Sequence, residues 1–138
     1  MAIFGALATS TNGLRTYRTW MDAVSDNIAN LNTVKPTDQE AFRARFVIAE
    51  AEDYGNAGQP GITAGSRVGG IEYGNPAGRL VHEPDHPFAD ADGNVRYPDI
   101  DLGAQMTNML LAQRGYQANL AVVERATQAY QAALQLGR

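Results

Sequence analysis

The last third of the chain carries a heptad pattern of apolar residues with almost no charge around it. From Leu102 to Leu136 the core positions alternate between spacings of four and three residues, which predicts one helix about 50 Å long that pairs with another helix. The first core set is Leu102, Met109, Tyr116, Val123 and Tyr130, and the second core set is Met106, Gln113, Leu120, Thr127 and Leu134. Because so few residues of the stretch are charged, we expect partners to cover more than one face of this helix.

A second heptad segment occupies residues 3–31. Its core positions are Leu7, Leu14, Met21 and Ile28 in one set and Ile3, Ser10, Tyr17, Val24 and Leu31 in the other. Gly5 and Gly13 each weaken such a helix by about 1 kcal/mol relative to alanine, so its first turns are expected to fray. The asparagines that precede Thr33 favour a helix C-cap, and Pro36 prevents the helix from continuing.

The middle of the chain differs in composition, because it holds all six prolines and most of the charged residues. Apolar residues alternate with Arg43 and Arg45, which predicts a half-buried strand. Its buried side is expected to carry Phe42, Ala44, Phe46 and Ile48. Residues 54–65 are rich in Gly, Asn and Pro and are expected to form a mobile loop.

Further short strands are expected in the second half of this middle segment. They span residues 67–73 and 79–82, with breaks at Gly69-Gly70 and Asn75-Pro76. The dipeptide Asp92-Gly93 predicts a hairpin turn. Asp99 or Asp101 is expected to cap the long C-terminal helix.

This order of elements predicts a mainly α fold with a small β insert. An antiparallel, coiled-coil-like pair of long terminal helices flanks a short β-rich middle segment, because the insert must turn the chain back for the helices to meet. We expect residues 1–33 and 100–138 to form one helical domain and residues 34–99 to form a β-rich and loop insert. The C-terminal helix is longer, so part of its seam should overhang the first helix.

Composition excludes several classes of function. A net charge of −4 gives no general attraction to nucleic acid or anionic lipid, and the absence of cysteine excludes disulfides and thiolate metal sites. The N-terminal stretch lacks a basic region and a long apolar run, so it predicts neither a cleaved secretion signal nor a transmembrane span. By those routes alone the protein would stay in the cytoplasm.

The histidines and aspartates of the middle segment are the candidates for a metal site. His82 and His86 are four residues apart, but prolines in between and after them prevent the helix that would align them. Asp90 and Asp92 are spaced as in a calcium loop, yet such a loop would then end on Asp99 and not on glutamate. We interpret both groups as turns, and we predict no metal, cofactor or small-molecule site.

Catalytic and nucleic-acid sites are also disfavoured. Carboxylates that could pair for acid–base catalysis are available only as scattered loop residues, without the apolar surroundings that shift a pKa. Arg43 and Arg45 beside Phe42 and Phe46 form too small a basic patch for nucleic acid on an acidic chain, so we interpret them as the solvated face of a strand. We therefore predict a protein without catalytic residues.

Three segments resemble the bacterial flagellar axial proteins, which are the rod, hook and hook-associated proteins. The N-terminal signature of that family is similar to three stretches of this chain. They are residues 6–14, residues 21–22 and the stretch Asn-Ile-Ala-Asn-Leu-Asn-Thr at residues 27–33. The segment before the last helix resembles the proximal-rod members of the family through Pro84, Asp85, His86, Pro87, Gly93, Tyr97 and Pro98. Residues 114–119 and 136–138 match their C-terminal helix, although Gln105 stands where an acidic residue is usual.

The resemblance implies a structural subunit of the basal-body proximal rod. Such subunits leave the cytoplasm through the flagellar type III export apparatus without a cleaved signal, and they polymerise in the periplasmic space into a helical drive shaft that transmits torque from rotor to hook. The implied partners are further copies, neighbouring proximal-rod proteins, proteins at the junction of the MS ring and export gate, and the export apparatus. Nucleic acid, small-molecule substrates and transmembrane insertion are not implied.

Two groups of residues are expected to serve assembly. The seam group consists of Leu7, Leu14, Met21, Ile28, Met109, Tyr116, Leu120 and Val123. The turn group consists of Asn27, Asn30, Asn32 and Thr33, which we expect to hydrogen-bond between subunits. The alternatives are another proximal-rod subunit of the same family or, in a different class, a soluble coiled-coil adaptor or chaperone-like binding protein. A small hydrolase or metal enzyme would need a site that the sequence does not show.

Overall fold

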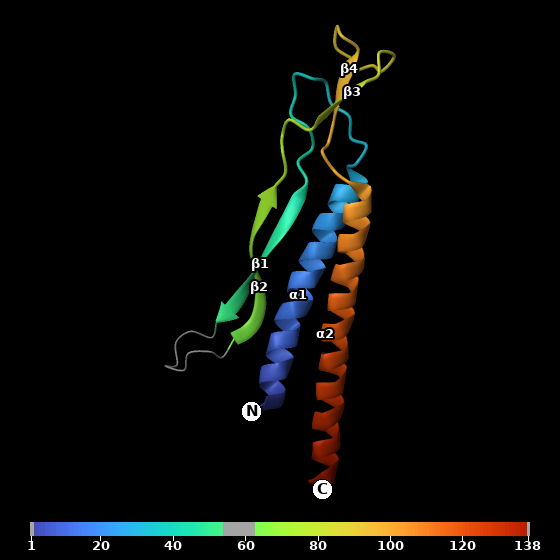
Figure 1. Ribbon diagram of the computed structural model, residues 1–138. Helices are drawn as coiled ribbons and strands as arrows, with labels where there is room; N and C mark the ends of the chain where they lie inside the picture. The colour runs from blue at the N-terminus through green and yellow to red at the C-terminus, as the bar shows by residue number, and fades with distance from the viewer. Residues whose placement is uncertain (1, 54–62, 138) are drawn as a thin grey trace.

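Two long helices flank a small region of antiparallel strands, so the predicted fold class is confirmed (Figure 1). The computed structural model describes residues 2–53 and 63–137. The elements in chain order are α1 (Ala2–Ala29), β1 (Arg45–Asp53), β2 (Thr63–Tyr73), β3 (Arg79–His82), β4 (Asn94–Tyr97) and α2 (Leu102–Leu136).

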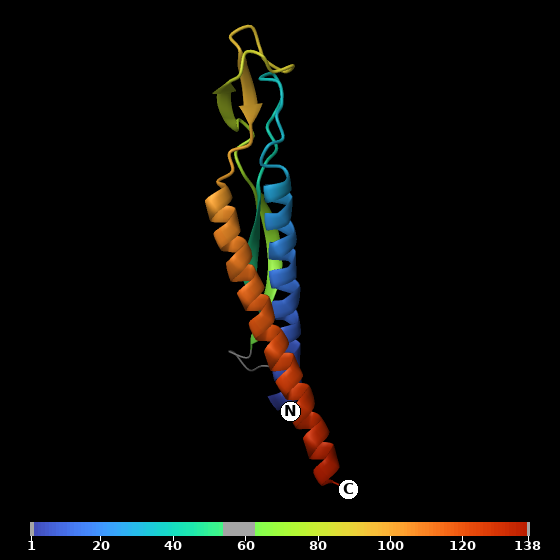
Figure 2. The same ribbon diagram turned by 90° about the vertical axis from the view of Figure 1, so that its right-hand side faces the viewer.

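The two helices lie side by side and antiparallel, with both chain ends at the same end of the molecule (Figures 1 and 2). The end of α2 projects beyond α1, as its greater length predicted. Asp101 caps α2 as expected, because its Oδ1 accepts a hydrogen bond of 2.8 Å from the Gly103 amide. α2 has the bounds that the heptad pattern predicted, whereas α1 ends at Ala29, two residues before the predicted end.

The face of α2 that meets α1 is rotated from the predicted one. The buried residues of α2 are Gln105 and Ala112, whereas Met106 of the second core set is 62% exposed and Leu120 is 39% exposed. The second core set is therefore wrong as a seam with α1. Of the first core set, Met109, Tyr116 and Val123 are half-buried, and Leu102 and Tyr130 are exposed.

Small residues explain this rotation, because they let the helices approach closely. A Cβ atom on Gly115 would lie 2.3 Å from Cε1 of Tyr17, and one on Gly13 would lie 2.6 Å from Oδ1 of Asn119. Gly13 is therefore a point of helix contact as well as a weak helix former. A seam built from the large residues of the second core set would hold the two helix axes further apart.

A buried pair of amide side chains joins three elements. Asn27 of α1 is 0% exposed, and its Nδ2 donates to Oε1 of Gln105 on α2 (3.0 Å) and to the carbonyl oxygen of Arg45 at the start of β1 (3.0 Å). The Arg45 amide in turn donates to Oδ1 of Asn27 (2.8 Å). The Arg45 guanidinium also pairs with the Asp26 carboxylate. We call Asn27, Gln105 and the Arg45 backbone the amide node.

Strands β1 and β2 form an antiparallel ribbon that packs against α1. The predicted break at Gly69-Gly70 is wrong, because β2 runs on through both glycines and the register shifts instead opposite them, between Ile48 and Ala49. The predicted burial of Phe46 and Ile48 is also wrong, since a two-stranded ribbon covered by one helix leaves both side chains exposed. The strand begins at Arg45 and not at Phe42. Most of the expected mobile loop, residues 54–62, lies outside the described residues.

Strands β3 and β4 form a second hairpin at the end of the molecule opposite the chain termini (Figure 1). Its centre is Val95, which is buried, and it is tied to the segment after α1 by two backbone hydrogen bonds of 2.9 Å between Lys35 and Arg96. The Arg96 guanidinium donates to the carbonyl oxygens of Thr37 (2.6 Å) and Ala77. Three separate chain segments, around Thr37, Ala77 and Arg96, are thereby held together at the base of this hairpin.

The turn predicted at Asp92-Gly93 exists but does not join two adjacent strands. The Gly93 amide donates to the Asp90 carbonyl oxygen (3.0 Å), and Gly93 has a φ of +76°. Residues 83–93 all lie between β3 and β4, so this turn closes the end of a long connection and does not link the two strands by itself. Other polar groups of this long connection, described below, hold it in place.

Removal of the Asn27 side chain should destabilise the protein. Asn27→Ala would leave the Gln105 amide and both backbone groups of Arg45 without their buried partner, which should lower the free energy of unfolding by roughly 2 kcal/mol or more. Urea denaturation followed by circular dichroism measures this change. Asn32→Ala, at an exposed asparagine after the same helix, should have an effect within about 0.5 kcal/mol. Equal midpoints for the two variants would contradict the role of the node.

Alanine substitutions at two helical glycines should have opposite effects. Gly115→Ala places a methyl group against the Tyr17 ring, and overpacking of this kind costs roughly 1–3 kcal/mol. Gly5→Ala meets no atom within 4 Å and should gain up to about 1 kcal/mol from helix propensity. Thermal denaturation should therefore give a lower Tm for the first variant and an equal or higher Tm for the second. A higher Tm for both would mean that the helices do not approach closely at Gly115.

Candidate assembly surface

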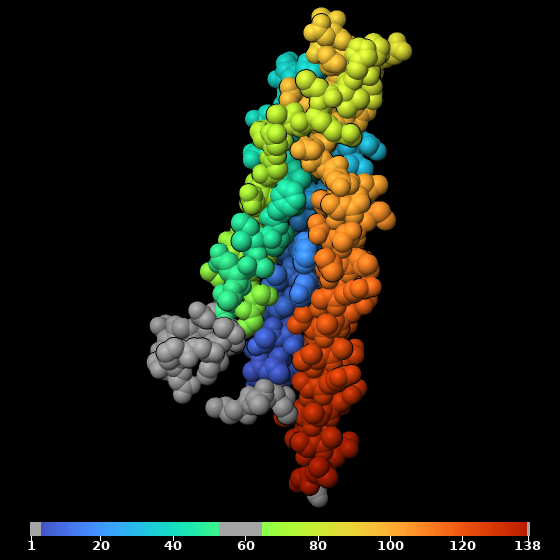
Figure 3. All heavy atoms as spheres, viewed as in Figure 1, coloured from blue at the N-terminus to red at the C-terminus, as the bar shows by residue number. Residues whose placement is uncertain are grey.

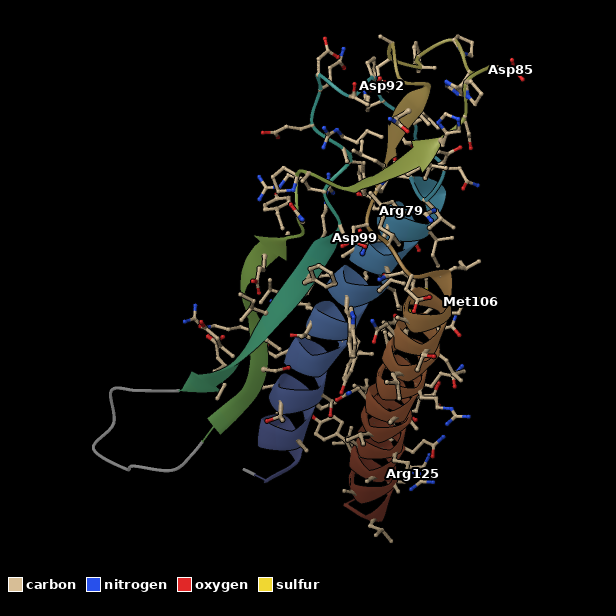
Figure 4. The ribbon with its side chains drawn as sticks, turned by 45° about the horizontal axis from the view of Figure 1, so that its top comes forward. Arg79, Asp85, Asp92, Asp99, Met106 and Arg125 are labelled. Atoms are coloured by element: carbon tan, nitrogen blue, oxygen red, sulfur yellow. The ribbon has the colours of Figure 1, made fainter. Side chains whose placement is uncertain are left out.

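The outer faces of α2 carry many exposed apolar side chains. They are Leu102, Met106, Leu110, Leu111, Leu120, Val122, Tyr130, Leu134 and Leu136. Only Arg114, Glu124 and Arg125 are charged along the whole helix. Figure 4 marks Met106 near the start of α2 and Arg125 closer to its end. Large exposed apolar areas on a soluble chain are typical of surfaces that bind other proteins, so α2 is the candidate assembly surface.

Part of this surface is hollowed into a groove near the start of α2. The groove has a volume of about 500 Å³ and is lined by Ile28, Met106, Thr107, Met109, Leu110 and Gln113. None of these side chains is charged. The groove continues the seam between the helices outward, so an apolar side chain that filled it would contact α1 and α2 together.

The predicted seam residues lie between core and surface. Leu7, Leu14, Met21 and Ile28 of α1 and Met109, Tyr116 and Val123 of α2 are all half-buried, and Leu120 is exposed. On α1 they flank a fully buried line formed by Ser10, Gly13, Thr16, Ala23, Val24 and Asn27. The apolar residues that the pattern singled out therefore border the helix contact and do not fill its centre.

The predicted turn residues are divided between the interior and the surface. Asn27 belongs to the amide node, so the expected role of its side chain in bonding between subunits is wrong: both of its polar atoms have partners inside the chain. Asn30 donates to the Asp26 carbonyl oxygen (2.9 Å) and accepts from the Thr33 hydroxyl (3.1 Å), which ends α1. Asn32 is exposed, and its role in assembly stays a prediction.

The predicted insert motif forms the tip of the molecule. Figure 4 shows Asp85 and Asp92 there, far from α2. The His86 amide donates to the Glu83 carbonyl oxygen (3.0 Å), and Nδ1 of His86 accepts from the Phe88 amide (3.1 Å). The motif residues Pro84, Asp85 and Pro87 are exposed, His86 and Tyr97 are half-buried, and Gly93 and Pro98 are buried.

Two residues with shifted pKa values hold the tip loop in place. The Tyr97 hydroxyl donates to the Glu83 carboxylate (3.0 Å), and this hydrogen bond raises the pKa of the phenol because only the protonated form can donate it. Oδ1 of Asp90 accepts from the amides of Asn94 (2.8 Å) and Asp92 (3.0 Å). These bonds, the one from Asn94 foremost, lower the pKa of the Asp90 carboxyl because they favour its charged form.

The carboxylate of Asp90 therefore stabilises a turn, as we interpreted it from the sequence. Its lone pairs face backbone amides, and the His86 ring nitrogen that faces the loop accepts from a backbone amide as well. No group of three His, Asp or Glu side chains within residues 2–53 and 63–137 is arranged to hold a metal ion. The tip is therefore a loop whose conformation is fixed by hydrogen bonds within the chain.

The side chains of Arg43 and Arg45 both interact with other groups of the same chain. Nε of Arg43 donates to the Gly74 carbonyl oxygen (3.1 Å), and its guanidinium lies 5.3 Å from the centre of the Tyr73 ring. Arg45 pairs with Asp26 of α1. Both arginines thus connect the ribbon to its surroundings. In the part of the chain that the structure describes, no helix is long and apolar enough to span a membrane.

Sequence reasoning missed the residues that form the centre of the helix contact. Gln105, Ala112, Asn119 and Ala126 each immediately precede a member of the second core set. They repeat every seven residues, and the first two are buried while the last two are half-buried. A search for small or amide residues in heptad spacing would have found them. A search for apolar residues alone selects their larger neighbours.

Comparisons with known proteins match both helices. The family model described as "Flagella basal body rod protein" matches residues 7–37, and the one described as "Flagellar basal body rod FlgEFG protein C-terminal" matches residues 91–136. The matched segments thus contain Asn27 and Gln105 of the amide node, the whole of α2 and most of α1, whereas Arg45 and the rest of the β1–β2 ribbon lie outside both.

Proteins named flagellar basal-body rod protein FlgC are similar to this chain over most of its length. The one from Yersinia enterocolitica is 38% identical over 104 residues, which cover 75% of this chain and 74% of the relative. The one from Escherichia coli O6:H1 is 30% identical over 123 residues, which cover 89% of each chain. The one from Borreliella burgdorferi is 29% identical over an alignment of 150 positions that covers 97% of each chain. The resemblance to rod proteins that the sequence motifs predicted is confirmed, and the chain belongs to the flagellar basal-body rod protein family.

Proposed function

We propose that α1 and α2 form the wall of the proximal rod and that neighbouring subunits cover the exposed apolar faces of α2. The observation that carries this proposal is the combination of nine exposed large hydrophobic side chains and only three charged side chains on α2. A helix whose outer faces stayed in contact with water would carry more charged residues. In this proposal residues 1–33 and 100–138 are the assembling domain, and residues 34–99 are an insert beside it.

Assembly on these faces is governed by the hydrophobic effect. Each Å² of apolar surface that a neighbour covers stabilises the assembly by about 25 cal/mol, so contacts on several faces make the polymer far more stable than the free chain. Contacts between different faces of successive copies are heterologous, and they generate a helical tube when the rotation does not close. The half-buried Leu14, Met21 and Met109 at the edge of the seam would be covered as well.

Transmission of torque requires that a subunit resist deformation. Close-packed interiors resist it because small displacements create overlaps and gaps. In this chain the near contact of Gly115 with Tyr17 and the amide node fix α2 on α1, and the node also fixes the start of β1. We infer that the helix pair and the ribbon move as one unit under load.

Export through the flagellar type III apparatus and assembly in the periplasmic space complete the proposal. A chain exported in unfolded form benefits from a weak isolated helix pair. The buried Ser10 and Thr16 in the seam bury less apolar area than large aliphatic side chains would, which limits the stability of the isolated helix pair. The partners proposed are further copies, neighbouring proximal-rod proteins, proteins at the junction of the MS ring and export gate, and the export apparatus. We propose no enzymatic activity.

The substitution Leu120→Asp should block rod completion while leaving secretion intact. Leu120 is 39% exposed in the single chain, so a charge there should cost the free subunit only about 1 kcal/mol, whereas it would be desolvated in the assembled wall. Electron microscopy of basal bodies and a motility assay measure the effect. Arg125→Glu, at a position that is already charged, serves as the control and should assemble. Normal motility of the Leu120→Asp strain would refute the assignment of this face.

The purified chain should associate in a concentration-dependent manner. Sedimentation velocity should show species that grow with protein concentration, and Leu120→Asp should shift them to higher concentration because it places a charge on the covered face. A coiled-coil adaptor or chaperone-like protein would instead sediment as one defined monomer or dimer over the whole range. That result, with presence of the chain outside the basal body, would favour the alternative.

A further inference from the structure

The C-terminal end of α2 has no partner within the described chain. The ring contact between Phe4 and Tyr130, with centroids 6.1 Å apart, lies where α1 begins, and residues 131–136 that follow are all exposed. Figures 2 and 3 show this end of α2 projecting beyond α1. Leu134 is 56% exposed and Leu136 is 90% exposed. We call residues 131–136 the overhang.

The groove described above lies at the other end of the same helix. Its lining by Met106, Met109, Leu110 and Ile28 provides an apolar cavity of about 500 Å³ next to the helix seam. Since an α-helix rises 1.5 Å per residue, Met106 and Leu134 are about 42 Å apart along α2. One elongated body therefore carries an apolar projection at one end and an apolar depression at the other.

The chemistry of the two features agrees. The overhang contains no charged residue and alternates leucines with glutamines and alanines, and the groove lining contains no charged residue either. A charged partner helix would lose its hydration in the groove without gaining an ion pair. Gln113 offers an amide at the groove that suits the amides of Gln131 and Gln135. The groove thus fits an uncharged, leucine-bearing helix end.

We infer that the groove binds the overhang of a second copy of this chain, in a head-to-tail contact; the inference rests on the proposed function and specifies one of its contacts. The overhang and the α2 side of the groove lie within residues 91–136, and Ile28 lies within residues 7–37, so both features belong to segments that match the rod family models. A contact between opposite ends is heterologous and leaves one groove and one overhang free, so it propagates. Leu134 and Leu136 would be buried on α2 and Ile28 of the neighbour.

A pair of engineered cysteines tests this contact in the full chain, which has no natural cysteine. We expect Met106→Cys combined with Leu134→Cys to give a ladder of covalent oligomers on mild oxidation, reversed by reductant. The two cysteines of one chain cannot bridge, because a disulfide needs Cα atoms within about 7 Å and these are about 42 Å apart. Both native side chains are more than half exposed, so the substitutions should leave the fold intact.

Two controls decide whether the ladder reflects the groove. Ala104→Cys with Leu134→Cys places the first cysteine at an exposed position outside the groove lining and should give no ladder. Leu134→Cys alone should remain monomeric. A ladder of equal yield from the Ala104 variant, or strong dimers from the single variant, would overturn the inference, because the overhangs would then meet other surfaces or each other. Absence of a ladder from the Met106 pair would overturn it as well.

A second measurement does not depend on cysteines. Leu134→Asp should raise the concentration at which the chain associates by about tenfold or more, since it removes one buried leucine from each contact. Unchanged association would again overturn the inference.

The proposed function is judged separately: if the Leu134 variants behave as wild type while Leu120→Asp still blocks the rod, only the head-to-tail contact fails. If the chain is absent from basal bodies, the proposed function fails.

Discussion

The amide node is the constraint on which the rest of the structure depends. Amide groups taken out of water must find hydrogen-bond partners, and Asn27 finds them on both α2 and β1. Sliding either helix by one turn would separate Asn27 from Gln105 and leave both unpaired. The node therefore fixes the axial register of the helix pair, which a seam of small residues alone leaves loosely defined. It also sets the point where the ribbon leaves the helices.

The small residues of the seam and the large residues outside it are two results of one arrangement. Glycine and alanine at the contact let the helix backbones approach, and this approach rotates the bulky members of the heptad away from α1. Met106 and Leu120 are exposed for this reason. In a protein that acts alone such exposure favours aggregation, whereas in a member of a rod family it leaves apolar area for neighbours. The contact within the chain and the proposed surface for contacts between chains are thus determined together.

The elements were more predictable from the sequence than their relative orientation. Heptad spacing and the Asp101 cap defined α2 correctly, because both are local properties of the chain. The face of α2 that meets α1 was mispredicted, because apolar periodicity cannot distinguish a residue buried by the same chain from one awaiting a neighbour. The ribbon was mispredicted at Phe46 and Ile48 for the same reason. The amide node was not predictable by hydrophobicity, since its members are polar and 78 residues apart.

The separation of the helices along the chain also bears on the kinetics of folding. Asn27 and Gln105 meet at a sequence separation of 78 residues, and Phe4 and Tyr130 meet across the whole insert. The entropy of closing so long a loop must be overcome before the pairing contributes any stability, and proteins dominated by distant contacts fold slowly. We therefore expect the helix pair to be the last part of the chain to form. A chain of this topology has a long interval in which its ends are separate, extended and able to meet another molecule before they meet each other.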